Sequence, residues 1–362
     1  MPEITIDDVD DLAAGAAVLG SGGGGETYIP TLMAVEAIRH HGPVPMVHPS
    51  ELDPGGLILP VGAIGAPIAM AEKFPSGQEF AAAIAVLERH LGRTGVGVLP
   101  IEVAGGAALL PIAAAAVAGL PVVDGDTMRR AFPKVELTQL GLAGISASPM
   151  VLVDVKGNTV LIEGRDNVDV ERLARTAVGE MGMIAIVVAY PTSAGQIEEF
   201  AIPGSLTYCL ELGRRIRSSQ TIDPDSYNEL LDHFMGRLIF TGKVGEINRR
   251  NERAGPRGTF TLEHLHAPDR VMRIDFQSEN LVAIEDGLPV VTVPDLISLV
   301  DSETGSPMTT ESLDYGQRVH VLALPAHERW HTPEGIALAG PRAFGYDLDY
   351  IPFGSVPSGV AP

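Results

Sequence analysis

Residues 96–126 read VGVLPIEVAGGAALLPIAAAAVAGLPVVDGD, and this stretch decides the fold class. It opens with a short apolar segment, 96–99, continues into an alanine-rich segment, 109–118, and ends on a second short apolar segment, 121–123. Apolar runs of about four to eight residues favour strands, and longer runs of strong helix formers favour helices. The order strand, helix, strand is typical of a right-handed parallel crossover.

The same alternation extends toward the N-terminus. We expect helices over 7–19, 28–40 and 78–93, and a strand over 57–61. Alternating strands and helices predict an α/β domain with a largely parallel sheet. We assign this domain to residues 1–165.

The pattern changes near residue 150. Residues 151–162 predict a hairpin around Gly157-Asn158. The elements expected next are a helix over 168–179, a strand over 183–190 and helices over 204–217 and 224–237. From Leu238 onward, short apolar runs separated by turns at 285–287 and 302–305 predict mostly β structure. Residues 166–362 therefore form a mixed α+β domain that is mostly β in its C-terminal part.

Composition limits the kinds of partner. The chain has 362 residues, enough for about two domains. It carries 25 Lys and Arg against 46 Asp and Glu, a net charge of −21. This charge repels nucleic acid and anionic lipid, since both carry phosphate groups. We expect small molecules as ligands, with no nucleic acid and no membrane as partner.

Cysteine usage and the N-terminus bear on the compartment. Cys209 is the single cysteine, which excludes an intramolecular disulfide and any site with several thiolates. Residues 1–8 lack the basic start and apolar run of a signal peptide. Residues 103–123 are uncharged but contain Pro111 and Pro121, so a buried helix and strand are expected rather than a membrane span. We expect a cytoplasmic protein.

Three carboxylates follow the predicted strands. Glu102 comes after one strand, and Asp124 and Asp126 come after the next. Because parallel strands present their carboxyl ends on one edge of a sheet, these three side chains are our candidate catalytic residues. They can serve general acid/base chemistry, or Asp124 and Asp126 can ligate a divalent metal ion. The structural alternative is that they cap helices and pair with Arg129 and Arg130.

A glycine run precedes the second predicted helix. Residues 20–25 read GSGGGG, which formally fits G-x-G-x-x-G. The dinucleotide motif follows a strand, however, and here a helix-like segment comes first. The run can instead form a backbone-lined concavity that binds an anion or a carbonyl oxygen, or it can be a flexible loop. The candidate substrate-binding residues are Ser21, Gly22, Gly23, Gly24, Gly25, Gly105 and Arg130.

Other reactive side chains give weaker signals. His327 and His331 are four residues apart, but they lie between Pro325 and Pro333, which disfavours a metal-binding helix. Cys209 lies on a predicted amphipathic helix and is interpreted as a packed apolar side chain. The G-x-S-x-G motif of serine hydrolases is absent from the sequence.

Several of these motifs occur together in one known family. Residues 19–28, LGSGGGGETY, resemble the opening motif of the S-methyl thiohydantoin desulfurase family, long catalogued as a domain of unknown function beside hydantoinase/oxoprolinase genes. Further matching segments are Glu102 with Gly105 and Pro111, 121–126, 130–133, 242–244, 279–283, 293–297, 315–319 and 340–346. The chain departs from the family pattern where Asn, Gly and Glu are expected, with Ala107, Arg129 and Lys134 in their places.

The resemblance implies a hydrolase acting on a five-membered cyclic amide or thioimidate, releasing a thiol and leaving a hydantoin. Water activated by a carboxylate or a divalent metal ion would attack the exocyclic C–S carbon, with glycine-loop N–H groups on the developing negative charge. Asp124 and Asp126 would bind the metal or act as base, Glu102 would be the acid/base, and Arg130 would hold a substrate carboxylate. The alternative is a non-catalytic partner subunit of a hydantoinase/oxoprolinase-type enzyme. A homo-oligomer is a further expectation.

Overall fold

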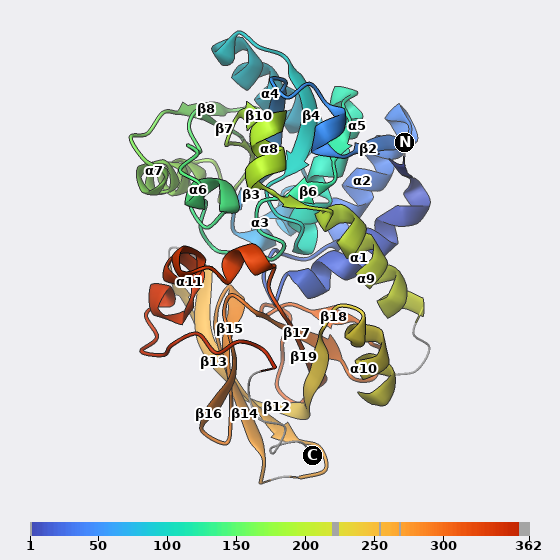
Figure 1. Ribbon diagram of the computed structural model, residues 1–362, viewed down its shortest axis with the longest axis vertical. Helices are drawn as coiled ribbons and strands as arrows, with labels where there is room; N and C mark the ends of the chain where they lie inside the picture. Colours follow the sequence, from blue (N-terminus) through green and yellow to red (C-terminus); the bar gives the residue numbers. More distant parts are fainter. Residues whose placement is uncertain (1, 219–223, 253–254, 268, 355–362) are drawn as a thin grey trace. The chain divides into compact units, whose positions relative to one another are not determined.

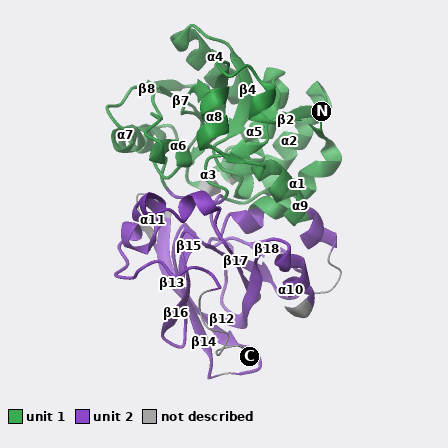
Figure 2. Cartoon of the chain, in the orientation of Figure 1, with its two compact units in different colours: residues 1–16, 25–129, 134–213 green, residues 17–24, 130–133, 214–362 purple. Residues whose placement is uncertain are grey.

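The structure is a computed structural model that describes residues 2–218, 224–252, 255–267 and 269–354 (Figure 1). The chain divides into two compact units (Figure 2). Unit 1 consists of Met1–Ala16, Gly25–Arg129 and Lys134–Gly213, and unit 2 consists of Ala17–Gly24, Arg130–Pro133 and Arg214–Pro362. The boundary expected near residue 165 lies inside unit 1.

Unit 1 is built on one sheet with the strand order β1-β2-β5-β4-β3-β9-β7-β8, and β10 pairs with β3. β2, β5, β4 and β3 are parallel to their neighbours in this run, whereas β9, β7, β8, β1 and β10 pair antiparallel. The strands are β1 Glu3–Ile4, β2 Val44–Val47, β3 Leu57–Gly65, β4 Gly95–Pro100, β5 Val122–Val123, β7 Met150–Val153, β8 Thr159–Ile162, β9 Ile184–Val188 and β10 Thr192–Ser193. The predicted α/β class and the hairpin over 151–162 are confirmed.

Helices accompany this sheet. The structure has the six helices predicted up to residue 217, and it adds three short ones at 67–72, 139–142 and 194–200. The helices are α1 Ile6–Leu19, α2 Tyr28–His41, α3 Pro67–Glu72, α4 Gln78–Leu91, α5 Leu110–Ala118, α6 Gln139–Leu142, α7 Asn167–Glu180, α8 Ala194–Phe200 and α9 Ser205–Ser218, with short 3-10 turns η1 Pro49–Glu51 and η2 Gly105–Ala108. α5 is buried along most of its length, since Ile112, Ala113, Ala114 and Ala115 are at most 1% exposed. The uncharged stretch 103–123 is thus a buried helix and strand, as predicted.

Two differences from prediction have different causes, one tertiary and one local. β3 was expected to end at Val61 but runs to Gly65, because Gly62–Gly65 pairs antiparallel with β9, which lies more than a hundred residues further along the chain. α8, between β10 and β11 (Ile202–Pro203), was not predicted. Ser193 caps it with a capping box closed by Gln196, a signal that is readable in the sequence.

Cys209 is packed as predicted. It is fully buried on α9, and its Sγ lies 3.4 Å from the Leu12 carbonyl oxygen of α1. A Cβ on Gly213 would lie 1.7 Å from the Asp11 carbonyl oxygen, so glycine permits this close approach of the two helices. Burial raises the pKa of the Cys209 thiol well above its ordinary value, which makes the thiol a poor nucleophile.

Unit 2 is built on an antiparallel sheet with the order β16-β15-β14-β13-β12-β19-β17-β18, which confirms mostly β structure after Leu238. Its elements are α10 Pro224–Asp232, β12 Arg237–Glu252, β13 Gly255–His264, β14 Val271–Gln277, β15 Glu279–Glu285, β16 Leu288–Thr292, β17 Leu296–Asp301, β18 Pro307–Met308, β19 Arg318–Leu324, η3 Glu328–Trp330, α11 Pro333–Ala339 and η4 Pro341–Phe344. α10 was expected to reach residue 237. It ends earlier because Met235 adopts a φ of 56° and Arg237 pairs with Ala323 of β19.

Candidate functional site

The predicted site residues belong to both units. Glu102, Asp124, Asp126, Gly25 and Gly105 lie in unit 1. Ser21, Gly22, Gly23, Gly24 and Arg130 lie in unit 2. The two sets have different surroundings, and their contacts indicate different roles.

Glu102 and Asp124 follow parallel neighbours in the sheet of unit 1. β4 and β5 pair in parallel with Val98 opposite Val122, so both residues come after the carboxyl ends of their strands at the same sheet edge. Asp126 lies in the two-residue strand β6, Gly125–Asp126, which pairs antiparallel with β11. Glu102 is half-buried, and its Oε2 atom is in the interior.

The Asp124 carboxylate holds the start of α9. Its Oδ1 accepts hydrogen bonds from the backbone N–H groups of Leu206 at 3.0 Å and Thr207 at 3.1 Å. Its Oδ2 accepts from the Thr207 hydroxyl at 2.6 Å. The first N–H groups of a helix have no partner within the helix, so a carboxylate placed there satisfies them and complements the helix dipole. Asp124 therefore caps α9 from a distant strand end.

We predict that Asp124→Ala lowers the unfolding free energy by about 0.5–2 kcal/mol, the usual loss for a helix cap, and that Asp124→Asn loses less. Asparagine keeps one acceptor oxygen in place. Turnover per folded molecule is expected to stay unchanged in both variants. Melting temperature and turnover measured on the same preparation test this. A loss of turnover of about a hundredfold with an unchanged melting temperature would instead make Asp124 catalytic.

The Asp126 carboxylate joins three segments in the interior of unit 1. Its side chain is fully buried. Oδ2 accepts from the N–H groups of Val103 at 2.9 Å and Arg129 at 2.6 Å, and Oδ1 accepts from the Ser205 hydroxyl at 2.7 Å. Burial raises the pKa of Asp126, and these hydrogen bonds oppose the rise. The contacts make Asp126 a structural connection between the strand ends and α9.

The carboxylate oxygens of the predicted acids are poorly placed to bind a metal ion. Those of Asp124 and Asp126 already accept hydrogen bonds from protein donors. Within the described ranges, no group of three or more His, Cys, Asp and Glu side chains could hold a metal ion. Divalent ions in proteins prefer several oxygen ligands, so this donor set does not fit one. The metal ion expected from the sequence stays a prediction for metal analysis of the purified protein.

Arg129 occupies a position where the family resemblance leads us to expect glycine. Its φ is 51°, in the left-handed region. Its guanidinium lies over the Tyr208 ring at 4.9 Å, its Nε donates to the Ser205 hydroxyl at 3.2 Å, and its Nη2 donates to the Pro203 carbonyl. These contacts offset a backbone strain of about 1–2 kcal/mol.

The strain at Arg129 can be measured with two variants. Arg129→Ala and Arg129→Gly both remove the side-chain contacts, but only glycine relieves the positive φ. We expect Arg129→Gly to unfold with a free energy about 1 kcal/mol higher than that of Arg129→Ala. Urea denaturation of the two variants tests this. Equal stabilities would contradict the assignment of strain.

The glycine loop is fixed within unit 2. Ser21 is fully buried, and its Oγ donates to the Ile297 carbonyl at 3.0 Å and accepts from the Ile297 N–H at 2.9 Å. The Gly22 carbonyl accepts from the Thr310 N–H at 2.9 Å. A Cβ on Gly23 would lie 2.3 Å from Oε1 and 2.7 Å from Cγ of Glu279. The loop is therefore anchored, and glycine lets it pass directly against the buried Glu279 side chain.

Arg130 is a fully buried cation in unit 2. Its Nη1 donates to the carbonyls of Pro294 and, at 3.1 Å, of Asp295, and its Nε donates to its neighbour's carbonyl at 3.0 Å. Burial lowers the pKa of Arg130 to about 10, while Glu279 and Asp295 oppose the fall, so the side chain stays charged at neutral pH. Its Nη2 is buried and has no hydrogen-bond partner among the described residues.

Aromatic rings surround this arginine. The Arg130 guanidinium lies 4.4 Å from the centre of the Phe132 ring. Phe132 meets Trp330 edge-on at 5.0 Å and stacks with Phe344 at 6.4 Å. Segment 130–133 therefore brings a cation and an aromatic face into unit 2.

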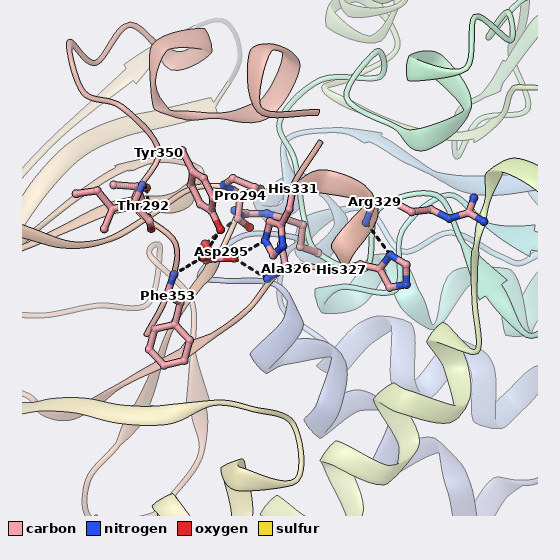
Figure 3. Close-up of polar contacts among 11 residues, drawn as sticks. Thr292, Pro294, Asp295, Ala326, His327, Arg329, His331, Tyr350 and Phe353 are labelled. Atoms are coloured by element: carbon pink, nitrogen blue, oxygen red, sulfur yellow. Dashed lines mark hydrogen bonds and ion pairs between the residues drawn. The ribbon is translucent and has the colours of Figure 1, made fainter. Parts of the chain in front are cut away.

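The sequence did not predict a second polar group in unit 2, centred on Asp295 (Figure 3). Asp295 is fully buried, and its Oδ1 accepts from the Ala326 N–H at 2.8 Å and lies 3.1 Å from His331 Nε2. Its Oδ2 accepts from the Tyr350 hydroxyl and the Phe353 N–H, each at 2.8 Å. His331 and Asp295 are 36 residues apart, so no local spacing revealed the pair.

His327 has a separate role. Its Nδ1 accepts from the Arg329 N–H at 3.3 Å and caps η3, as Figure 3 shows. His327 Nδ1 and His331 Nε2 thus have different hydrogen-bond partners, the Arg329 N–H and the Asp295 carboxylate. The stretch 327–331 contains a single 3-10 turn rather than an α-helix.

The fold and these groups define an α/β unit combined with an antiparallel β unit that carries a buried arginine and a histidine–aspartate pair. The chain belongs to the S-Me-THD-like family: the family's N-terminal domain matches residues 7–164 and its C-terminal domain matches residues 165–353. This confirms the resemblance found in the motifs.

A solved structure supports the fold. The crystal structure of a protein from Chromobacterium violaceum is similar at 24% identity and a TM-score of 0.81, over 97% of this chain and 100% of that chain. Comparison with curated proteins gives no match. Among the described residues, every helix is too short or too polar to cross a bilayer.

Proposed function

We propose that this protein hydrolyses a five-membered cyclic thioimidate of the S-methyl thiohydantoin class. The oxygen of water replaces the methylthio group on the ring carbon, methanethiol leaves, and the ring becomes a hydantoin. Family membership supports the substrate class. The observation that carries the proposal is the buried Nη2 of Arg130.

A buried guanidinium without full pairing costs several kcal/mol of folding free energy, so this donor requires a compensating use. A carbonyl or carboxylate oxygen of a ligand would accept its hydrogen bond. Thiohydantoins carry a ring carbonyl, and a flat ring bound at Arg130 would lie close to Phe132, whose ring centre is 4.4 Å from the guanidinium. A charged donor would also stabilise negative charge that develops on the ring during attack by water.

The three acids predicted from the sequence have different roles in this proposal. Asp124 and Asp126 each accept three hydrogen bonds from the protein and hold unit 1 together. Glu102 remains a candidate acid/base group. If it transfers protons, Glu102→Gln will lower turnover by about a hundredfold or more without loss of folding.

Incubation of the purified protein with S-methyl thiohydantoins tests the reaction. We expect methanethiol and hydantoin in equal amounts, and one oxygen-18 atom in the hydantoin when the solvent is labelled water. Absence of thiol release would contradict the proposal. A stable complex with a hydantoinase-type enzyme, without turnover by the isolated chain, would support the partner-subunit interpretation instead.

A further inference from the structure

We propose that His331, oriented by Asp295, moves the protons in this reaction, in place of Glu102, the acid/base residue expected from the sequence. The inference rests on the proposed function and names a catalytic side chain for it. It is carried by the geometry of the His331–Asp295 pair and by its connection to Arg130.

The hydrogen bond to Asp295 fixes the state of the imidazole. Four donors surround the Asp295 carboxylate, two at each oxygen, and His331 Nε2 is one of them. Since a carboxylate accepts, Nε2 of the neutral ring carries the hydrogen and Nδ1 keeps its lone pair. In the part of the chain that the structure describes, Nδ1 makes no hydrogen bond. The His331 side chain is 33% exposed and that of Asp295 is fully buried.

The surroundings of His331 also hold the ring in place. The Tyr350 ring stacks on it at 5.6 Å with an angle of 23° between the planes. Among the described residues, Asp295 and Tyr350 are the titratable groups that contact the imidazole, and Glu328 and Arg329 precede it in η3. A buried carboxylate behind a partly exposed, oriented imidazole is the arrangement that general-base histidines use.

Two series of contacts connect His331 to Arg130, one through Asp295 and one through aromatic rings. Arg130 Nη1 donates to the backbone carbonyls of Pro294 and Asp295, and the Asp295 side chain holds His331. Trp330, next to His331 in the chain, packs edge-on against Phe132, the ring that lies against Arg130. The Arg130 guanidinium and the His331 imidazole are therefore positioned by the same connected set of residues in unit 2.

The proton transfers balance. As the water oxygen bonds to the ring carbon, Nδ1 takes one water proton and the C=N electrons move to the ring nitrogen, which then receives that proton. Nδ1 next takes the remaining hydroxyl proton as C=O forms and the C–S bond breaks, and the imidazolium gives this proton to the leaving thiolate. One water is consumed, and the imidazole ends unchanged.

His331→Gln tests the proposal, because glutamine can keep a donor toward Asp295 but has no basic nitrogen. We expect kcat to fall by about 10²- to 10⁴-fold with KM changed little. Because glutamine has no ionisable nitrogen, the limb of the wild-type pH–rate profile that a general base causes should disappear in this variant. His327→Gln is the matched control: it removes the η3 cap, and turnover per folded molecule and the pH limb should persist.

A second readout separates this inference from the proposed function. Nitrogen-15 NMR of the His331 ring, assigned by its loss in His331→Gln, should show the tautomer protonated at Nε2. If wild type releases thiol and His331→Gln does so at the same rate, the inference is overturned and the hydrolase remains. If wild type releases no thiol, the proposed function fails and the tautomer decides: protonation at Nδ1 overturns the role of Asp295, and protonation at Nε2 supports it.

Discussion

Replacing Arg130 by methionine is expected to abolish most turnover and to destabilise the protein. Methionine fills much of the same space but donates no hydrogen bonds, so the Pro294 and Asp295 carbonyls and the buried Glu279 lose their cationic partner. Removal of one partner from a buried charge pair costs about 3–5 kcal/mol of unfolding free energy. Loss of a buried charged donor to the substrate lowers kcat/KM by about 10²-fold or more.

Two further variants make this test specific. Arg130→Lys keeps the charge, but its single ammonium cannot reproduce the separate donors Nη1 and Nη2, so it should fold better than Arg130→Met and still turn over slowly. Arg129→Ala changes the preceding arginine and should lose stability while keeping turnover per folded molecule. Denaturation and kinetics on each preparation supply both quantities. A folded Arg130→Met protein with wild-type kcat/KM would remove Arg130 from the site.

Replacing Asp126 by alanine is expected to cost about 3 kcal/mol or more of unfolding free energy. Three donors, the N–H groups of Val103 and Arg129 and the Ser205 hydroxyl, would be left in the interior, at about 1–3 kcal/mol for each one unsatisfied. Asp126→Asn should lose far less, because its amide oxygen can accept the two N–H groups and its amide nitrogen can donate to Ser205. Urea denaturation of the two variants measures the difference.

The difference in unfolding free energy between wild type and Asp126→Asn should change with pH in a definite direction. Burial raises the pKa of Asp126 in the folded protein above its ordinary value of 3.8, so the folded state binds a proton that the unfolded chain has released. The unfolding free energy of wild type therefore falls as pH rises from about 4 through the raised pKa. The asparagine side chain of the variant does not titrate. The stability of Asp126→Asn relative to wild type should improve over this range, and a constant or opposite difference would contradict the raised pKa.

Local patterns predicted the fold well because they depend on neighbouring residues. The alanine-rich α5 and the short apolar runs of β4 and β5 have one dominant interpretation each, and the structure agrees. The extension of β3 to Gly65 was missed because its partner β9 is distant in the sequence. The conformation of residues that follow a predicted strand end depends on such distant partners.

The site was predictable only in part for the same reason. Arg130 and the acids at the strand ends could be named from motifs. The donors to Asp124 come from Leu206 and Thr207, 82 and 83 residues later, so its capping role had no local signal. In the sequence, His331 stands out only through its spacing of four residues from His327. Its partner Asp295 lies in segment 293–297, which matches the family motif, and no spacing joins the two residues.

The division of the chain between the units limits how this protein can be cut or recombined. Ser21 and Arg130 belong to unit 2, although they precede most of it by more than eighty residues. A fragment starting at residue 165 would lack the hydroxyl that bonds Ile297 and the guanidinium that bonds Pro294 and Asp295. Exchange of C-terminal halves between relatives would therefore succeed only where the new C-terminal half can form the same hydrogen bonds with the serine and the arginine of the N-terminal half.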